Sequence, residues 1–216
     1  MHQWMVDGVD IPCTDGVMIA DTVQIGTGTT ILPGTILLGN TTIGKDCLIG
    51  PNTYIMDGTV GNGVTLDNVK LTDSTVEDGA DAGPFVQIRG GSVLHTGVHI
   101  GDFVEVKNTT VGAGTKSAHL TYIGDSDVGA GVNFGCGTVT VNYDGKNKSR
   151  CKIGDGAFIG CNTNLVAPVE VGDRAYIAAG STITDDIPGD ALSIARARQV
   201  NKPGWVTEKK PYKEKK

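Results

Sequence analysis

The sequence predicts an all-β protein, built as a parallel β-helix in which short strands wind into stacked coils. Three observations predict this fold. Aliphatic residues recur every six positions from Val23 to Ile183, glycine often follows the aliphatic, and a small Thr or Ser often stands four positions after it. Glycine supplies 32 of the 216 residues and aromatics only 5%, which disfavours a helical bundle, while 39% hydrophobic residues disfavour a disordered chain.

A period of six fits neither an amphipathic helix nor an array of hairpins. It is typical of a three-sided prism in which each side is one short strand. The aliphatic then points inward, the small residue fills the corner, and glycine allows the backbone to turn. Coils stack ~4.8 Å apart, so the repeat predicts about nine coils, each buried only against its neighbours.

The repeat divides the chain into three parts. Residues 1–22 precede it and are expected to form an irregular segment that caps the first coil. The repeat itself predicts a β-helix domain over 23–187. Residues 188–216 follow as a short C-terminal arm, in which the good helix formers of 191–199 could form a helix. The lysine-rich end of this arm is expected to be mobile.

One polar loop, predicted at 141–152, interrupts the β-helix. The six-residue register is lost between Thr140 and Ile153, and Asp144-Gly145 marks a turn, so this segment must leave the prism. A regular rod with one such loop predicts a binding site beside the rod.

Composition excludes several classes of function. A net charge of −6 provides no basic footprint for nucleic acid. Five cysteines, an odd number without CxxC spacing, favour a reduced cytoplasmic protein over a disulfide framework. No apolar run approaches the ~20 residues of a membrane span, and no signal peptide opens the chain, so we expect no membrane partner.

His119 is the candidate general base. A neutral imidazole near pH 7 can accept a proton from an amine, and the residues around His119 are small or apolar. A corner histidine that only bonds the backbone is an equally good interpretation of its position. Backbone N–H groups of the glycine-bracketed turn at 135–137 are candidate donors to an oxyanion.

Three cations depart from the repeat on either side of His119. Arg89 and Lys107 each follow an inward aliphatic, where most coils have a small residue, and Lys148 lies in the polar loop. Cations at such places could bind an anion such as a phosphate, although a solvated surface is the alternative for any single lysine.

Other polar residues of the interrupted region could bind a sugar. Neutral hydrogen-bonding groups suited to hydroxyls belong to Tyr122, Asn133, Asn142 and Tyr143. Cys136 and Cys161 occupy small-residue positions and are interpreted as packing residues rather than nucleophiles or metal ligands, because no neighbour in sequence activates them.

Several segments carry a resemblance to a known family. They are GDFVEVKN, TKSAHLTYIGD, VNFGCGTVTVNYDGKNK, NTNLVAPV and IAAGSTIT. These resemble the C-terminal half of bifunctional N-acetylglucosamine-1-phosphate uridyltransferase/glucosamine-1-phosphate N-acetyltransferase, from about Ile19 to Trp205. The resemblance implies a left-handed β-helix of hexapeptide repeats, although most parallel crossovers are right-handed.

The resemblance also implies a reaction. That half transfers acetyl from acetyl-CoA, as cosubstrate, to the amine of glucosamine 1-phosphate, and the product supplies UDP-N-acetylglucosamine for peptidoglycan and lipid A. No metal is implied for this step. A homotrimer is implied, with active sites between subunits, in which Arg196 could reach a neighbour's cofactor.

The resemblance assigns roles residue by residue. His119 corresponds to the general base and Asn133 to a sugar contact. The phosphate-binding group corresponds to Arg89, Lys107, Tyr122 and Lys148. The acetyl-CoA pocket corresponds to Cys136, Asn142, Tyr143, Cys161, Ala179 and Arg196, and Asn142 and Tyr143 would also line the sugar.

Three departures from the family are visible. Cys136 and Cys161 stand where the family often has Ala and Ser, and Gly90 replaces a usual proline, which could loosen Arg89. No glycine-rich nucleotide loop is present, so we expect no uridyltransferase activity. A hexapeptide acyltransferase for another amino-sugar phosphate and a non-catalytic trimerising rod remain as alternatives.

Overall fold

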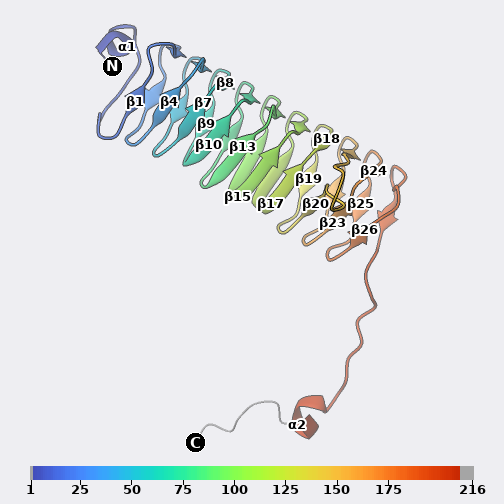
Figure 1. Cartoon of the computed structure of the whole chain (residues 1–216). Helices are drawn as coiled ribbons and strands as arrows, with labels where there is room; N and C mark the ends of the chain where they lie inside the picture. The colour runs from blue at the N-terminus through green and yellow to red at the C-terminus, as the bar shows by residue number, and fades with distance from the viewer. Residues whose placement is uncertain (1, 210–216) are drawn as a thin grey trace, which may run out of the picture.

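The chain folds into a three-sided rod of stacked coils, seen in a computed structural model that describes residues 2–209 (Figure 1). Twenty-seven short strands, all paired in parallel, make up two sheets of eighteen and nine strands. Counted along the strands, the described part of the chain has about ten coils, close to the nine that the repeat predicts. The parallel β-solenoid predicted from the six-residue period is therefore confirmed.

Three faces follow from the strand pairing, and each takes one strand from a coil. The first face contains β1 (Met18–Ile19), β4 (Ile36–Leu38), β7 (Tyr54–Met56), β10 (Val69–Thr72), β13 (Val86–Arg89), β20 (Val139–Val141), β23 (Asn164–Val166) and β26 (Thr182–Ile183).

The second face contains β3 (Thr30–Ile31), β6 (Leu48–Ile49), β9 (Thr65–Leu66), β12 (Asp81–Ala82), β19 (Asn133–Phe134), β22 (Phe158–Ile159), β25 (Tyr176–Ile177) and β27 (Leu192–Ser193). The third face is the nine-stranded sheet, with β2 (Gln24–Ile25), β5 (Thr42–Ile43), β8 (Thr59–Val60), β11 (Thr75–Val76), β14 (Val93–Leu94), β16 (Thr110–Val111), β18 (Ser126–Val128), β21 (Cys151–Ile153) and β24 (Val169–Val171).

Two long strands join the first and second faces. β15 (His99–Lys107) and β17 (Lys116–Gly124) each have nine residues and continue around a corner, so both faces count as one sheet. Asp102 and His119 pair in register at this corner. In these two coils the strand continues without a break from one face to the next. His119, the candidate base, lies where the strand bends around the corner.

The core is a stack of aliphatic side chains with small polar residues at the corners. The largest fully buried side chains are Ile31, Leu37, Ile49, Ile55, Leu66, Leu71, Ile88, Leu94, Ile100, Ile123, Ile159 and Leu165. The small residues four positions after the aliphatic are also fully buried, and include Thr29, Thr35, Thr53, Ser92, Thr115, Thr138, Thr163 and Ser181. This inward pattern confirms the predicted role of each repeat position.

Ser117 takes an aliphatic position in the coil of His119. It pairs in register with Phe134, an inward-facing phenylalanine of the next coil, so a small side chain here makes room for a large neighbour. The buried hydroxyl of Ser117 has no hydrogen-bond partner among the described residues. The apolar core is divided into two clusters at this level.

Three predicted boundaries need correction. Residues 1–22 are not irregular, because they contain α1 (His2–Val6) and β1, which pairs with β4 and so belongs to the stacked coils. The polar loop is shorter than 141–152, since β20 ends at Val141 and β21 begins at Cys151.

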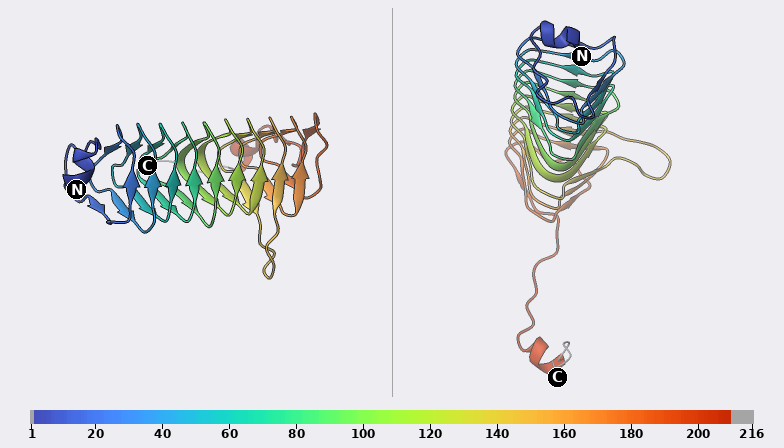
Figure 2. Two further views of the ribbon diagram at one scale, coloured as in Figure 1. Left: turned by 90° about the horizontal axis from the view of Figure 1, so that it is seen from above. Right: turned by 90° about the vertical axis from the view of Figure 1, so that its left-hand side faces the viewer.

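The loop leaves the rod sideways, which is clearest when the rod is viewed along its length (Figure 2).

The helix predicted at 191–199 in the C-terminal arm is wrong. Leu192 and Ser193 form β27, which pairs with β25 and adds a last strand to the second face. The only helix of the arm among the described residues is α2 (Trp205–Lys209), to which the chain extends away from the rod (Figure 1). The lysine-rich end predicted to be mobile lies largely in 210–216, outside the described residues.

Candidate active site

Three cations gather at the corner where the first face meets the third. Arg89 ends β13 and Lys107 ends β15, and the two pair in register on neighbouring coils. Lys148 reaches the same place from the loop and lies against Lys107. Arg89 donates from Nε to Glu105 at 2.8 Å and from Nη2 at 2.7 Å. These two contacts with Glu105 hold the Arg89 guanidinium in place, so Gly90 does not leave the Arg89 side chain loose.

Asp125 is the buried centre of the cluster, with a residue exposure of 4%. Its Oδ2 accepts from Lys107 Nζ at 3.3 Å and from the Asn142 amide, and its Oδ1 accepts from Asn108 at 2.5 Å. Burial would raise the pKa of Asp125, but the hydrogen bonds from Asn108, Asn142 and Lys107 outweigh it and lower that pKa. The carboxylate is therefore charged at neutral pH and ties the cation cluster to the start of the loop.

Lys148 supplies charge that the protein itself does not neutralise. Arg89 and Lys107 have carboxylate partners, whereas no carboxylate lies within 4 Å of the Lys148 amine in the described part of the chain. Contact with Lys107, and the positive charges of Lys107 and Arg89, lower the pKa of Lys148. Burial opposes the charge on Lys107, but the hydrogen bond and the negative charge of Asp125 hold the Lys107 pKa above its ordinary value. An incoming anion would relieve this repulsion, so the cluster favours anion binding.

Tyr122 folds back over Gly124 to reach the same corner. A Cβ placed on Gly124 would lie 2.3 Å from Tyr122 Oη, so only glycine leaves room for the ring in this position. The Tyr122 hydroxyl accepts a hydrogen bond from the Asn142 amide at 3.3 Å. Tyr122, Asn142, Asp125 and the cations therefore form one connected group.

His119 begins a second group, which runs along the corner between the first and second faces. For each pair of successive coils, the strand pairs on the two sides of this corner have the same sequence offset, which is 17, then 25, then 18 residues. His119 is therefore aligned with Cys136, Cys161 and Ala179 on successive coils. We call these four residues the corner column. His119 lies on β17, three residues before Tyr122, so the corner column is separated from the cation cluster by part of this strand.

Arg196 stands at the far end of the corner column. Its Cδ lies 3.6 Å from the position of a Cβ on Gly180, the residue after Ala179. In the single chain the Arg196 side chain therefore lies beside its own column, and its reach to a neighbouring subunit's cofactor stays a prediction.

Two interpretations of the corner need correction. Cys136 and Cys161 are exposed rather than packed in the repeat, because Thr138 and Thr163 fill the buried small-residue positions. Cys136 also has a histidine as neighbour, since His119 is aligned with it one coil away.

The candidate oxyanion donors are also reduced in number. Gly135 donates its N–H to Ile159 and Gly137 donates to Leu120, both at 2.7 Å. Only the Cys136 N–H of this turn has no backbone acceptor among the described residues.

The single chain does not bring every predicted residue together. Asn133 lies on β19 of the second face, where it pairs with Lys116 and Phe158, on the other side of the corner from Tyr122. Tyr143 is exposed on the loop and donates its hydroxyl to Gly145 at 2.6 Å. The predicted set is therefore split between two faces of the rod.

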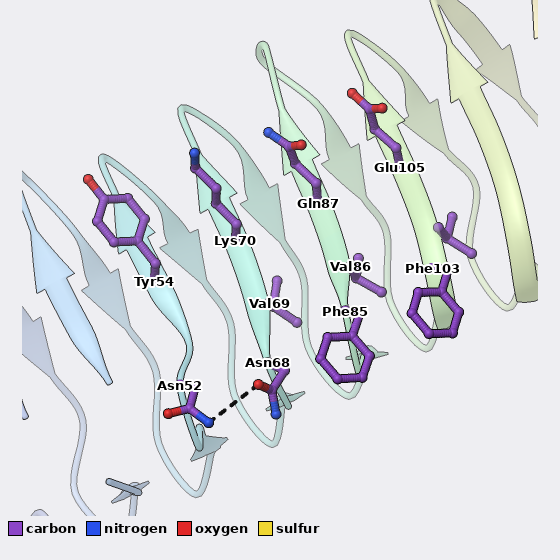
Figure 3. A pocket seen from close by; sticks show the side chains of 11 residues that line it. Asn52, Tyr54, Asn68, Val69, Lys70, Phe85, Val86, Gln87, Phe103 and Glu105 are labelled. Atoms are coloured by element: carbon purple, nitrogen blue, oxygen red, sulfur yellow. Dashed lines mark hydrogen bonds between the residues drawn. The ribbon is translucent and has the colours of Figure 1, made fainter. Parts of the chain in front are cut away.

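Apolar side chains border the site on its outer surface. Phe85 and Phe103 stack with ring centroids 5.3 Å apart, and they expose 59% and 58% of their surface, as does Leu120 at 60%. In Figure 3 both rings project from the corner, while Gln87 and Glu105 stand on the strands behind them. Two hollows of about 350 and 360 Å³ adjoin this ridge, and the second is lined by Tyr122 as well as Leu120.

Sequence reasoning missed Asp125, Glu105 and Asn108. Asp125 has a φ of 47° and Asn108 of 47°, so both occupy the left-handed turn position of their coils. Asn and Asp are common there for backbone reasons alone, which hides the carboxylate at the centre of the cation cluster. The five-residue step from Ile123 to Val128 was the available signal.

Two further observations concern metal-ligand groups and helix length among the described residues. No group of three His, Cys, Asp or Glu side chains is arranged to hold a metal ion within 2–209. Neither described helix is long and apolar enough to span a membrane.

Comparisons with known proteins agree with the repeat. Residues 150–185 match the family described as bacterial transferase hexapeptide (six repeats), and residues 40–68 match the hexapeptide repeat of succinyl-transferase. A solved structure of Francisella novicida UDP-N-acetylglucosamine acyltransferase has a similar fold, with a TM-score of 0.53 and 16% identity over 86% of this chain and 66% of that one.

Relatives of much higher identity share one description, bifunctional protein GlmU. The protein of that description from Geobacillus sp. (strain WCH70) is 56% identical over 202 residues, 94% of this chain and 44% of the relative. The one from Halalkalibacterium halodurans is 52% identical over 206 residues, 95% of this chain and 45% of the relative. The chain thus spans a little under half the length of these relatives.

Proposed function

Because the chain resembles part of bifunctional GlmU proteins over almost all of its length, we propose that it is an acetyl-CoA-dependent glucosamine-1-phosphate N-acetyltransferase. The part it resembles would be their C-terminal acetyltransferase half. The reaction transfers the acetyl group of acetyl-CoA to the amine of glucosamine 1-phosphate. The product, N-acetylglucosamine 1-phosphate, would supply UDP-N-acetylglucosamine synthesis in the cytoplasm.

The cation cluster is the observation that carries this proposal. A sugar phosphate is doubly charged near neutral pH, and Arg89, Lys107 and Lys148 form a corner whose net positive charge remains after Glu105 and Asp125 are counted. Lys148 and the free edge of the Arg89 guanidinium would bind the phosphate oxygens by charge-assisted hydrogen bonds. The hydroxyl of Tyr122 and the amide of Asn142 stand beside them for the sugar.

His119 is proposed to act on the amine. The protonated amine has no lone pair with which to attack a thioester, so a base must hold the proton as the tetrahedral intermediate forms. The imidazole is exposed at the corner, on the same strand as Tyr122 and three residues before it. The Cys136 N–H, which is not used by the strand ladder, is the proposed donor to the oxyanion.

The corner column is proposed to bind the acyl-CoA. Three steps between coils, at ~4.8 Å each, place Ala179 about 14 Å from His119 along the rod. An extended pantetheine arm can cover this distance with its thioester at His119. Arg196, beside Gly180 at the far end, would then contact a phosphate of the CoA nucleotide.

A homotrimer is proposed as the active form. The ridge of Phe85, Phe103 and Leu120 exposes three large apolar side chains in a row, which favours burial against another chain. Asn133 lies on a different face from the cation cluster, so a second copy could complete the sugar site with its own Asn133. Light scattering tests this, and a fully active monomer would contradict it.

A thiol-release assay tests the activity. Acetyl-CoA is mixed with the protein and with glucosamine 1-phosphate, glucosamine or another amino-sugar phosphate, and free CoA is measured. We expect release only with glucosamine 1-phosphate. Equal rates with glucosamine would contradict the phosphate site, preference for another amino-sugar phosphate would assign a different substrate, and failure to bind CoA would favour a structural rod.

A further inference from the structure

Two exposed thiols lie next to each other in the corner column. Cys136 and Cys161 are 25 residues apart in sequence, but strand pairs on either side of the corner keep this same offset. The N–H of Asn162 donates to the carbonyl oxygen of Cys136 at 2.8 Å, which fixes the alignment of the two turns. The thiols therefore occupy equivalent positions on consecutive coils, and both are exposed.

This alignment satisfies the backbone requirement for a disulfide. Neighbouring strands lie ~4.8 Å apart. Bonded cysteines have Cα atoms about 4.4–6.8 Å apart. The side chains project from the same corner, where no strand pairing constrains their rotation. A bridge can therefore close with rotation of the side chains and little movement of the coils.

The other cysteines differ from this pair. Cys47 and Cys151 are buried, and burial raises the pKa of Cys47 and raises that of Cys151 to about 11, so both react slowly as nucleophiles. Cys13 is half-buried and lies in the first part of the chain, far from both in sequence. Among the described residues, Cys136 and Cys161 alone combine exposure with an aligned neighbour.

We propose that Cys136 and Cys161 form a reversible thiol–disulfide site. The disulfide would block the acyl-CoA track, by which we mean the path of the pantetheine arm along the corner column. The effect on acyl-CoA rests on the function proposed above, because the pantetheine arm would lie over these two residues on its way from His119 to Ala179. A disulfide there changes the shape of the track at its middle. Bound acyl-CoA, in turn, shields the thiols from reagents.

The reaction partner is a low-molecular-weight disulfide. One protein thiolate attacks it, forming a mixed disulfide and releasing one small thiol. The second protein thiolate then attacks the mixed disulfide, forming the Cys136–Cys161 bond and releasing the second small thiol. The two cysteines are oxidised by two electrons and the small disulfide is reduced by two, with the two thiol protons carried away by the products.

Glutathione disulfide is the probe for the test, applied to a Cys13→Ser background that keeps the pair. Intact mass under non-reducing conditions distinguishes a bridge, which loses two hydrogens, from a retained glutathione. We expect the bridged form, localised by peptide mapping to Cys136 and Cys161, with loss of most acetyl transfer and recovery in dithiothreitol. Acetyl-CoA added first should slow the bridging.

Matched single variants separate the steps. In the same background, Cys136→Ala and Cys161→Ser should each retain glutathione on the remaining cysteine, because no partner thiol can expel it. Stable glutathione on both cysteines of the unsubstituted pair would overturn the proposal, since the thiols would then be too far apart. Bridging at an unchanged rate with saturating acetyl-CoA would overturn the placement in the track. Failure of the proposed function itself would show separately, as absence of acetyl transfer before any oxidation.

Discussion

The Nζ of Lys107 lies 3.3 Å from the Oδ2 of Asp125, a buried carboxylate on the next coil. Asp125 also accepts from Asn142, the residue at which the loop leaves the rod. One side chain therefore positions a cation of the candidate phosphate site and the base of the loop that carries Lys148. The geometry of the cluster depends on Asp125 more than on any single cation.

Substitution of this carboxylate should affect both stability and substrate binding. Asp125→Asn removes the negative charge and leaves Lys107 without its partner, and we expect a loss of about 3 kcal/mol in the free energy of unfolding. The KM for glucosamine 1-phosphate should rise more than that for acetyl-CoA. Denaturant unfolding and initial rates measure the two effects, with Asp127→Asn, on the exposed third face, as the control. Equal changes in the two variants would contradict a special role for Asp125.

The lowered pKa of Asp125 predicts how stability depends on pH. A carboxyl with a folded-state pKa below its unfolded value of ~3.9 stabilises the protein above that value, and this contribution is lost as pH falls through the folded-state pKa. The stability difference between the protein and Asp125→Asn should therefore be constant near neutral pH and shrink below about pH 4. Unfolding curves of both proteins between pH 7 and pH 3 measure it, and a difference that grows on acidification would refute the charged state.

Lys148→Ala should weaken use of the sugar phosphate. Loss of one charge-assisted hydrogen bond costs about 1.5–3 kcal/mol, or roughly ten- to hundred-fold in kcat/KM. The effect should appear in glucosamine 1-phosphate kinetics and leave acetyl-CoA binding nearly unchanged. Lys146→Ala is a matched control, because Lys146 is exposed on the same loop and only its backbone N–H is bonded, to Asp144. A similar loss in both variants would point to the loop rather than to the charge.

His119→Ala should lower turnover by about 10²–10⁴-fold, because it removes the proposed general base. Binding of CoA and the oligomeric state should persist, since the side chain is exposed and supports no buried contact. Single-turnover kinetics at saturating substrates measure the change, and His95→Ala, on the third face, is the control. Near-normal turnover in a folded His119→Ala protein would return His119 to a structural role.

Ser117→Ala should stabilise the protein or leave its stability unchanged. The Ser117 hydroxyl is buried without a partner, and removing such a group relieves a desolvation penalty of about 1–3 kcal/mol. Thr115 is the matched control two residues earlier. Its hydroxyl donates to Gly129 at 2.9 Å and accepts from the Val132 N–H at 3.0 Å, so Thr115→Ala should destabilise. Thermal unfolding should show a lower Tm for Thr115→Ala and an equal or higher Tm for Ser117→Ala, and destabilisation by Ser117→Ala would show that its hydroxyl is satisfied.

The fold was predictable because one local rule repeats. Each aliphatic such as Ile88 or Ile159 points inward for the same reason, so a six-residue period defines strands, corners and coil number together. The C-terminal end was not predictable from local preference. The segment after Gly189 has good helix formers, yet β25 offers an unpaired edge, and Leu192 pairs with Tyr176 there. The tertiary hydrogen bonds outweigh the local preference.

The site was predictable only where its residues break the repeat. Arg89 and Lys107 replace small residues, so they were visible in the sequence, and His119 and Lys148 accompany a register change. Asp125 matches the turn chemistry of its position and was hidden by it. The alignment of the corner column was hidden for another reason. The inserted loop lengthens one coil, so the sequence offsets along the column vary although the spatial step does not.

Helix α1 lies across the first coil at one end of the rod (Figure 1). Trp4 packs against the core there, and Asp10 pairs with Thr30, so the outermost backbone edge is covered. A stack of identical steps has no intrinsic length, because any exposed terminal coil presents the same hydrogen-bonding groups that the next coil would use. In this chain the short helix and the segment after it therefore act as a cover for the edge against which a further coil could pair.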